Sequence, residues 1–504
     1  MSNPPSGRRP NLLLIYSDQH CASVTGCYGD PVVQTPNLDH LATRGVVFEN
    51  AYCPSPLCVP SRMSFLSGRH PYEIEVWTND HVLDSGIPTF AHAMGAAGYR
   101  PILIGRLHAL GPDQLHGYAE RLLGDHGPNH AGGRPVDHGT LDGTAGPYRV
   151  SLRKSGRGQS AYQVHDEYVT AATVGYLREL GIRKRAGLAP EPFCLTVGLM
   201  LPHQPFVARG EDYELYRGKV QPPKCPEPFS DHLHPYFRWW RTVSGIERVT
   251  DEEVLRARTA YWALVTRMDA MIGEILDALR ENGLEENTLI IYSSDHGEQL
   301  GEHGLWWKQT FYEASVRVPA ILSWPGVLSE GIRCGHVINS LDLNATMLDA
   351  LGAPALPNSR GRNLLPLLLS ADAPWDDTTF SEYCTDEGCL HRMIRSGDWK
   401  LNYYHGQEPQ LFNLAEDPNE LIDRAQDPAC QQVQDRLTHA VLEGWDPEAI
   451  SRRMRMKLAD LKILEAWARN TQPEDQYRWS LLPEMDYLDS DQTPEDNCVL
   501  SDNS

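Results

Sequence analysis

The stretch Asn11-Leu-Leu-Leu-Ile-Tyr-Ser17, followed directly by Asp18 and Gln19, decides the fold class that we predict for this chain. A short and nearly continuous apolar run of this kind is typical of a strand buried on both faces of a parallel sheet. Ligands of an open α/β sheet bind outside the carboxyl ends of its strands, so polar clusters after several strands should share one edge. The same order recurs three times, with residues 99–105 before Arg106 and His108, residues 193–199 before His203, and residues 287–293 before Asp295 and His296.

The length and charge of the chain limit the kind of protein. Its 504 residues predict one large α/β domain and a smaller one. Lys and Arg number 45 against 67 Asp and Glu, a formal charge of −22, which argues against a nucleic-acid surface or an anionic membrane as partner. An anionic substrate must therefore be attracted by a local positive site.

Two further features concern the compartment. The first ten residues contain no apolar signal segment, and no apolar run reaches ~18 residues. The eleven cysteines are odd in number and lack CxxC pairs, which fits free thiols in a reducing compartment. We therefore expect a cytoplasmic protein.

The order of elements changes near residue 370. Before it, strands alternate with helical segments, one of which opens with the capping box Thr250-Asp-Glu-Glu253 and ends near Gly283. Residues 124–160 are rich in Gly, Pro and His and predict a long loop over the edge of the sheet. We predict a main α/β domain over residues 1–370, a smaller α+β domain over 371–470 that ends in a basic helix, and an acidic tail over 471–504.

The pentapeptide Cys58-Val59-Pro60-Ser61-Arg62 points to a reactive site. Proline suits the first turn of a helix, and the apolar positions that follow lead to Gly68, so a helix is predicted to begin near Val59. Cys58 would then lie at the helix N-terminus, where free N–H groups and the helix dipole favour an anion. Arg62, four residues on, would lie on the same face.

The polar clusters predict a metal and an anion site. Asp18, Asp295 and His296 are ligands suited to Ca²⁺, Mg²⁺ or Mn²⁺. Cationic and donor side chains at the same edge could hold a tetrahedral oxyanion whose charge grows in the transition state. These side chains are Arg62, Arg106, His108, His203 and Lys308.

The chain resembles the sulfatases of the alkaline-phosphatase-like superfamily, nearly from end to end. Gly111-Pro-Asp-Gln-Leu-His-Gly117 and Asn79 resemble the choline-sulfatase-like and phosphonate-monoester-hydrolase-like members most closely. The resemblance implies an alkaline-phosphatase-like, mostly parallel sheet with helices on both faces. The matching motifs are residues 11–19, Thr35-Pro-Asn-Leu-Asp39, residues 58–68, Gly105-Arg-Leu-His108, Leu201-Pro-His-Gln-Pro205, residues 294–303, Leu305-Trp-Trp-Lys308, and Leu411-Phe-Asn-Leu414 with Asp417.

The resemblance also implies the chemistry. Cys58 would be converted to formylglycine by a formylglycine-generating enzyme, and its hydrated aldehyde would be the nucleophile in the hydrolysis of sulfate monoesters. One divalent metal ion, Ca²⁺ or Mn²⁺ with Mg²⁺ as a third candidate, would be held by Asp18, Gln19, residue 58, Asp295 and His296. Arg62 would orient the nucleophile. The sulfuryl oxygens and the leaving group would be held by Asn79, Arg106, His108, His203 and Lys308.

Two positions depart from the family pattern. Gln19 stands where many sulfatases have a second aspartate, which removes one formal charge from the metal site. Arg106 replaces the usual lysine and exchanges a compact ammonium for a planar guanidinium. The departures leave the choice of ion and the leaving-group contacts open.

Other functions remain open at this point. Phosphonate monoester or phosphodiester hydrolysis is the second hypothesis, because the same cations fit a phosphoryl group, and a non-catalytic binding protein is the third. Specificity for choline sulfate would need an anionic or aromatic cage for the trimethylammonium group. Candidates for that cage are Trp77, Asp386, Glu387 and the aromatic residues of the tail.

The tail leads to a prediction about assembly. From Asn470 on it carries nine acidic side chains and one basic side chain, with Tyr477, Trp479 and Tyr487 among them. Such a segment is too apolar to be only a solvated tail. We expect a homo-oligomer, a dimer or a tetramer, in which residues 473–490 contact a neighbouring subunit near its active site.

Overall fold

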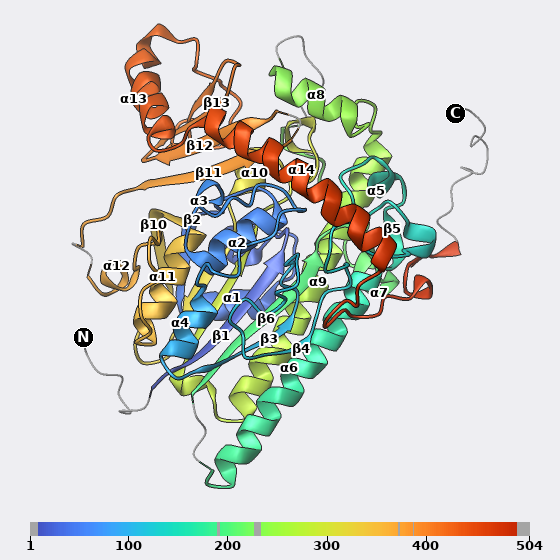
Figure 1. Cartoon of the computed structure of the whole chain (residues 1–504), viewed down its shortest axis with the longest axis vertical. Coiled ribbons are helices and arrows are strands. Elements are labelled where there is room, and N and C mark those ends of the chain that lie inside the picture. Colours follow the sequence, from blue (N-terminus) through green and yellow to red (C-terminus); the bar gives the residue numbers. More distant parts are fainter. Residues whose placement is uncertain (1–8, 189–191, 226–232, 371–372, 387, 491–504) are drawn as a thin grey trace.

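The structure is a computed structural model, and it describes residues 9–188, 192–225, 233–370, 373–386 and 388–490. A large α/β unit is built around one central sheet, and a smaller antiparallel sheet lies beside it at the top of the view in Figure 1. This arrangement confirms the predicted fold class.

The central sheet has eight strands in the order β10-β2-β9-β8-β1-β6-β3-β4. Strand β9 runs antiparallel to both of its neighbours, and the other paired strands are parallel. The strands are β1 (Asn11–Asp18), β2 (Val46–Tyr52), β3 (Arg100–Gly105), β4 (Glu120–Leu123), β6 (Phe193–Pro202), β8 (Thr288–Ser294), β9 (Ala320–Ser323) and β10 (Ile332–Asn339).

The strand register explains why residues distant in sequence meet. Strands β1 and β8 pair without a shift from Asn11 opposite Thr288 to Ser17 opposite Ser294. Asp18 and Asp295 are therefore the next residues at neighbouring strand ends. Strands β6 and β3 flank β1 on its other side, and they deliver His203 and Arg106 to the same edge. The predicted sharing of one edge is confirmed.

Helices cover both faces of the central sheet, as Figure 1 shows. Helices α1, α6 and α9 pack together on one face, and α2, α4 and α11 pack together on the other. The helices of this unit are α1 (Pro36–Thr43), α2 (Cys58–Ser67), α3 (Pro71–Ile74), α4 (Phe90–Ala96), α5 (Val150–Arg153), α6 (Ala161–Arg185), α7 (Gly210–Glu214), α8 (Pro235–Val243), α9 (Asp251–Glu281), α10 (Glu313–Val316), α11 (Ser340–Ala350) and α12 (Leu365–Leu369).

Helix α9 follows the prediction from its capping box. The Thr250 side chain accepts from the backbone N–H of Glu253, and the Glu253 carboxylate accepts from the Thr250 N–H. The helix ends at Glu281, and Gly283 follows with a φ of 65°. Its Tyr261 hydroxyl donates to the backbone carbonyl of Gln19. This packing helix therefore also supports the turn after β1.

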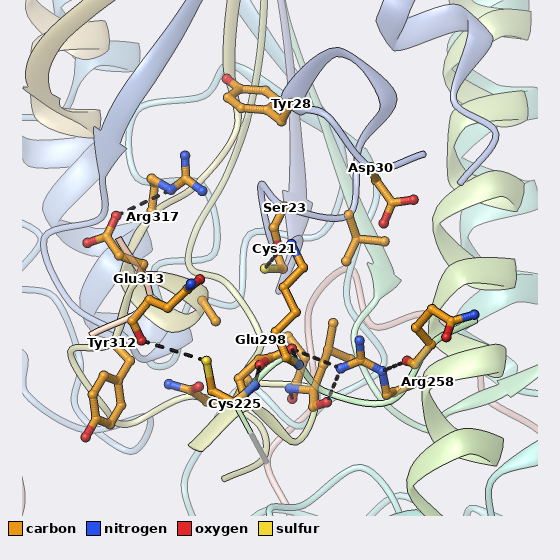
Figure 2. Close-up of a pocket in the computed structure, with 18 of the residues that line it drawn as sticks. Cys21, Ser23, Tyr28, Asp30, Cys225, Arg258, Glu298, Tyr312, Glu313 and Arg317 are labelled. Carbon is orange, nitrogen blue, oxygen red and sulfur yellow. Dashed lines mark hydrogen bonds and ion pairs between the residues drawn. The ribbon is translucent and has the colours of Figure 1, made fainter. Parts of the chain in front are cut away.

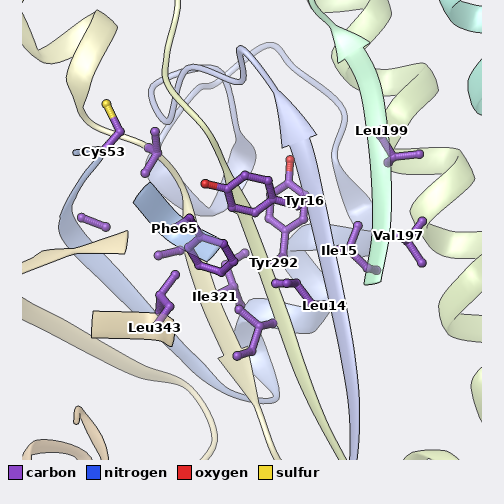
Figure 3. Packing of buried hydrophobic residues seen from close by; sticks show 14 of the residues in the cluster. Leu14, Ile15, Tyr16, Cys53, Phe65, Val197, Leu199, Tyr292, Ile321 and Leu343 are labelled. Atoms are coloured by element: carbon purple, nitrogen blue, oxygen red, sulfur yellow. The ribbon is translucent and has the colours of Figure 1, made fainter. Parts of the chain in front are cut away.

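The main core lies between the sheet and its helices. Leu12, Leu13, Leu14 and Ile15 of β1 are almost completely buried, as a strand covered on both faces requires. Figure 3 shows Tyr16 of β1 next to Phe65 of α2 in this core. The rings of Tyr16 and Phe65 stack with centroids 4.8 Å apart, which joins β1 to α2.

The second unit has its own small core. Its antiparallel sheet packs on α13, with Ile394, Leu401, Leu411, Leu437 and Val441 buried between them. The exact domain boundaries at residues 370 and 470 stay predictions. Its strands and helices are β11 (Thr378–Cys384), β12 (Leu390–Ser396), β13 (Trp399–Tyr404), β14 (Gln410–Asn413), α13 (Gln431–Leu442) and α14 (Pro447–Thr471).

The segment predicted as a long loop, residues 124–160, is only partly irregular. It contains α5 and β5 (Gly156–Gln159), because the backbone of residues 156 and 157 pairs with β7 (Val207–Ala208). Strand β5 also pairs with β15 (Tyr487–Leu488) of the tail. The predicted long loop therefore contains short regular elements near its C-terminal end.

Two predictions concern the cysteines and membrane spans. The ten cysteines in the described part of the chain are all free thiols, as expected. No helix within the described residues combines the length and the apolarity needed to cross a bilayer.

Candidate active site

Helix α2 places Cys58 at its first position, as the pentapeptide predicted. Leu57 is the extended N-cap residue, and Gly68 ends the helix in the left-handed conformation with a φ of 70°. The side-chain oxygen of Asn79 accepts from the backbone N–H of Val59 at 3.0 Å. Asn79 thus caps the helix from outside, while it also lines the cavity above Cys58.

Four buried side chains converge at this helix end. The ligand atoms of Asp18, Cys58, Asp295 and His296 all lie within 4.8 Å of one another. His296 Nδ1 donates to the carbonyl of Gly297 at 3.0 Å, so its Nε2 lone pair faces the Cys58 sulfur at 3.2 Å. A carbonyl that fixes the imidazole in this way is the usual support of a metal-binding histidine.

Two arginine side chains form ion pairs with the two aspartates of the cluster. Arg62 donates from Nε to Asp295 Oδ2 at 2.8 Å and from Nη2 to Asp18 Oδ2 at 3.1 Å. Arg106 Nε also donates to Asp18 Oδ2. Burial acts to raise the pKa of Asp18, but the charges of Arg106, Arg62 and Lys308 hold it well below its ordinary value. Asp18 is therefore ionised. Both arginines contact its Oδ2, so its Oδ1 is available as a ligand at the centre of the cluster.

These residues fit a divalent cation. The cluster offers two carboxylates, one imidazole nitrogen and the side chain of residue 58, all completely or almost completely buried. Such a donor set suits a hard or borderline ion such as Ca²⁺, Mg²⁺ or Mn²⁺.

Lys308 and His203 flank the sulfur of Cys58. Lys308 Nζ lies 3.0 Å from Cys58 Sγ and 3.0 Å from His203 Nε2. His203 Nδ1 donates to the carbonyl of Gln204 at 2.5 Å, so its Nε2 is an acceptor. Burial and the nearby Lys308 hold the pKa of His203 well below its ordinary value, so His203 is neutral at pH 7.

Arg106 and His108 form the opposite wall. Arg106 Nη2 lies 2.9 Å from His108 Nδ1, and burial together with the Arg106 charge lowers the pKa of His108. Asp125 accepts from the backbone N–H groups of Leu107 and His108 at 3.2 and 2.9 Å. It thereby fixes the loop that carries both side chains.

Gln19 follows β1 with a φ of 67°. Its Oε1 accepts from Lys308 Nζ at 2.6 Å, and its Nε2 donates to Gln204 Oε1 at 2.5 Å and to Glu298 Oε2. The amide therefore borders the four-residue cluster, and its role as a metal ligand stays a prediction.

Six of the predicted site residues line one cavity of about 410 Å³, whereas Asp18, Gln19, Asp295 and His296 are not part of its lining. Cys58, Asn79, Arg106, His108, His203 and Lys308 all line it. Arg62 lies beneath its floor with 3% exposure, where its contacts hold the two aspartates.

The candidates for a trimethylammonium cage do not line this cavity. Trp77 is buried in a separate cluster with Trp445, and Lys457 Nζ lies 5.9 Å from its ring. Asp386 and the tail aromatics are also absent from the described lining, while Glu387 is outside the described residues. Among the residues that the structure describes, none of these candidates therefore lines the cavity of its own chain.

Several polar residues of the cavity wall were missed in the sequence, among them Asp125, His126 and Tyr162. Asp125 and His126 follow the short strand β4, so the pattern of a strand and then a polar cluster could have identified them. Tyr162 lies in α6 without a comparable signal.

The tail holds this wall in place from outside. The backbone N–H of Trp479 donates to the carbonyl of Asp125 at 2.8 Å. The Asp475 carboxylate accepts from the backbone N–H of Asn129, also at 2.8 Å. Asp486 contacts His138 Nδ1 at 2.9 Å. The described part of the tail therefore packs on its own chain. Contact of the tail with a second subunit stays a prediction.

Comparisons with known proteins agree with this geometry. A family model described as Sulfatase matches residues 10–353, and one described as N-sulphoglucosamine sulphohydrolase, C-terminal, matches residues 301–445. A choline-sulfatase of Rhizobium meliloti (strain 1021) is 33% identical over 476 residues, 92% of each chain. Arylsulfatase K of Homo sapiens is 32% identical over 458 residues, 83% of this chain and 80% of the relative.

A solved structure shows the same fold. The phosphonate monoester hydrolase of Agrobacterium radiobacter matches with a TM-score of 0.71 at 22% identity, covering 91% of this chain and 96% of that chain.

Proposed function

Because this chain belongs to the sulfatase family and is a sulfuric ester hydrolase, we propose that it cleaves small sulfate monoesters at residue 58, in the cavity between Lys308 and Arg106. The observation that supports this proposal best is the convergence of Asp18, Cys58, Asp295 and His296 at the buried start of α2. Formylglycine at residue 58 would supply the nucleophilic hydroxyl of a hydrated aldehyde.

The same four residues would hold the metal. A divalent ion there, Ca²⁺ or Mn²⁺ in our proposal, would lower the pKa of that hydroxyl and polarise a sulfuryl oxygen. Arg62 would keep Asp18 and Asp295 in place for it, since it contacts both carboxylates.

The remaining side chains would act on the substrate. Lys308, 3.0 Å from the Cys58 sulfur, would stabilise charge on the sulfuryl and leaving oxygens. Neutral His203, held by Gln204, would contact the leaving group with its Nε2. Arg106 and His108 would hold sulfuryl oxygens from the opposite wall.

The cavity size favours a small leaving group. Its volume of about 410 Å³ leaves room for a sulfate group and a small organic group, rather than for several sugar rings. Choline sulfate, the substrate named for the Rhizobium relative, is a compound of this size and belongs in the first substrate set.

The test uses protein co-expressed with a formylglycine-generating enzyme. Turnover of 4-nitrophenyl sulfate, choline sulfate and a phenyl phosphonate monoester would be compared, and the sulfates should be preferred in kcat/KM. The Cys58→Ala variant should lose turnover, and the tryptic peptide of the parent should carry the aldehyde mass. Cys53→Ala, which changes a buried cysteine outside the cavity, is the matched control. A preference for the phosphonate, or normal turnover by Cys58→Ala, would contradict the proposal.

A further inference from the structure

We propose that Glu298 is a positioning residue that fixes the ammonium group of Lys308 beside residue 58 by acting through Gln19. The inference rests on the proposed function of Lys308 at the leaving group. Glu298 does not line the active-site cavity and lies outside the predicted site.

The two oxygens of the Glu298 carboxylate accept hydrogen bonds from different parts of the chain. Its Oε1 accepts from the backbone N–H groups of Leu300 at 3.1 Å and Trp307 at 2.5 Å. Its Oε2 accepts from Nε2 of Gln19. Trp307 directly precedes Lys308, so one oxygen holds the backbone that carries the lysine and the other holds the residue that its ammonium contacts.

The hydrogen bonds of Gln19 give its amide one orientation. Both hydrogens of its Nε2 have acceptors, Glu298 Oε2 and Gln204 Oε1. The Oε1 is therefore turned to Lys308, whose Nζ lies 2.6 Å away. An amide has only one acceptor oxygen, so reversing it would place an N–H group against the ammonium.

The backbone around Lys308 needs such support. Trp307 and Gln309 have φ angles of 64° and 69°, a region that side chains with a Cβ seldom occupy. The bond from the Trp307 N–H to Glu298 stabilises this turn from the protein interior. Loss of the bond would release the segment that places Lys308 in the cavity.

Glu298 also borders a second cavity, but its carboxylate makes no hydrogen bond to the arginines of that cavity's wall among the contacts that the structure describes. That cavity, of about 390 Å³, is drawn in Figure 2 with Glu298, Arg258 and Arg317 on its wall. Arg258 donates to the carbonyls of Gln221 and Leu300, and Arg317 pairs with Glu313. The hydrogen bonds found for the Glu298 carboxylate instead go to Gln19, Leu300 and Trp307.

A Glu298→Gln substitution changes hydrogen bonding with almost no change of volume. The new amide at position 298 can still accept from the Trp307 N–H through its oxygen, but its nitrogen then meets Nε2 of Gln19, donor against donor. Gln19 can relieve this contact only by turning its own oxygen away from Lys308. The ammonium would then lose an acceptor and move away from residue 58.

The experiment measures kcat/KM for aryl sulfates with leaving groups of different pKa. We expect Glu298→Gln to lower kcat/KM about 10- to 100-fold, the usual effect of a lost supporting contact. The loss should be larger for poor leaving groups, since they depend most on charge stabilisation by Lys308. The matched control is Glu302→Gln in the same loop, because Glu302 contacts Arg258 and the N–H groups of Lys224 and Cys225 but not Gln19. It should change kcat/KM less than threefold, with an unchanged dependence on leaving-group pKa.

A reciprocal substitution separates positioning from folding. Gln19→Glu alone sets two carboxylates against each other and should lower kcat/KM, whereas combined with Glu298→Gln it restores a donor facing an acceptor. The double variant should therefore exceed the Glu298→Gln variant in kcat/KM, with metal content measured in each protein. Additive losses, or equal effects on all leaving groups, would overturn the inference. An inactive parent enzyme would instead overturn the proposed function.

Discussion

Replacing Lys308 by alanine should remove most of the catalytic power and leave the fold intact. The side chain is 4% exposed, and its ammonium lies 2.6 Å from Gln19 Oε1, 3.0 Å from Cys58 Sγ and 3.0 Å from His203 Nε2. Losing one preorganised donor at the reacting atoms costs on the order of 10²–10³ in kcat, or about 3–4 kcal/mol of transition-state stabilisation. We expect the upper end of this range, because solvent has little access to replace the ammonium.

The same substitution should change the pH dependence. Burial lowers the pKa of His203 most, the Lys308 charge lowers it further, and Asp18 opposes both. Without Lys308 the pKa of His203 should move up toward its ordinary value. His203 would then become protonated at a higher pH, so the acid limb of the kcat/KM profile should shift to higher pH.

The assay follows kcat and KM for 4-nitrophenyl sulfate and for a sulfate with a poorer leaving group across pH. Lys184→Ala, on the exposed end of α6, serves as the control for loss of a lysine. Lys308→Arg keeps the charge and should retain part of the activity. A decrease below threefold with both substrates, together with an unmoved acid limb, would refute the reasoning.

Three further predictions concern the metal, the stability and the tail. Asp295→Asn should lower the bound divalent metal measured by elemental analysis and abolish turnover; full turnover by chelated, metal-free parent enzyme would contradict the site. Burial raises the pKa of Glu382 from 4.5 to about 8 against the opposing charge of Arg392, so the folded state holds the proton more tightly and stability falls as pH rises from 4.5 through 8. Glu382→Gln should therefore raise the free energy of unfolding, measured by denaturant titration, more at pH 8.5 than at pH 5, by on the order of a few kcal/mol. An equal change at both pH values would argue against it. The intact chain should be a dimer or tetramer by light scattering. A chain that ends at Asn470 should show a raised KM, because the cavity wall loses its contact with Trp479. An unchanged KM would disprove this support.

The parts of the fold predicted correctly are those with a local signal. The run Leu12 to Ile15 is apolar because both faces of β1 are covered, and the polar residue after it marks the strand end. The same signal precedes Asp295 and His203, and the parallel register of the strands then brings these residues to one edge. Helix α2 was predictable from Pro60 and Gly68, which fix its two ends.

The parts that could not be predicted depend on contacts between distant segments. Trp77 is an aromatic residue of the type that a trimethylammonium cage needs. Its neighbours Cys384, Leu390 and Trp445, however, come more than 300 positions later in the sequence and bury it. The wall at Asp125 and Asn129 is fixed by tail residues about 350 positions away. No hydrophobic periodicity or motif spacing within either segment indicates these long-range contacts.

Glu298 shows the same limit inside a recognised motif. It lies two residues after His296 and reads as part of the metal-binding sequence, but its carboxylate points to the amide of Gln19, which comes from the end of another strand. Only the packing of β1 against β8 makes that contact possible.

The burial of Cys58 would set a time limit on the conversion to formylglycine that we propose for this residue. The thiol is 1% exposed, so an oxidising enzyme has access to it only before the sheet closes over α2. Closure needs β8, which begins at Thr288, 230 residues after position 58. A ribosome adds about 5–20 residues per second, so this leaves roughly 10–50 s in which the nascent chain presents the cysteine. Yield of modified protein should therefore depend on how fast translation runs relative to the supply of maturing enzyme, and slower synthesis in a heterologous host should increase the modified fraction.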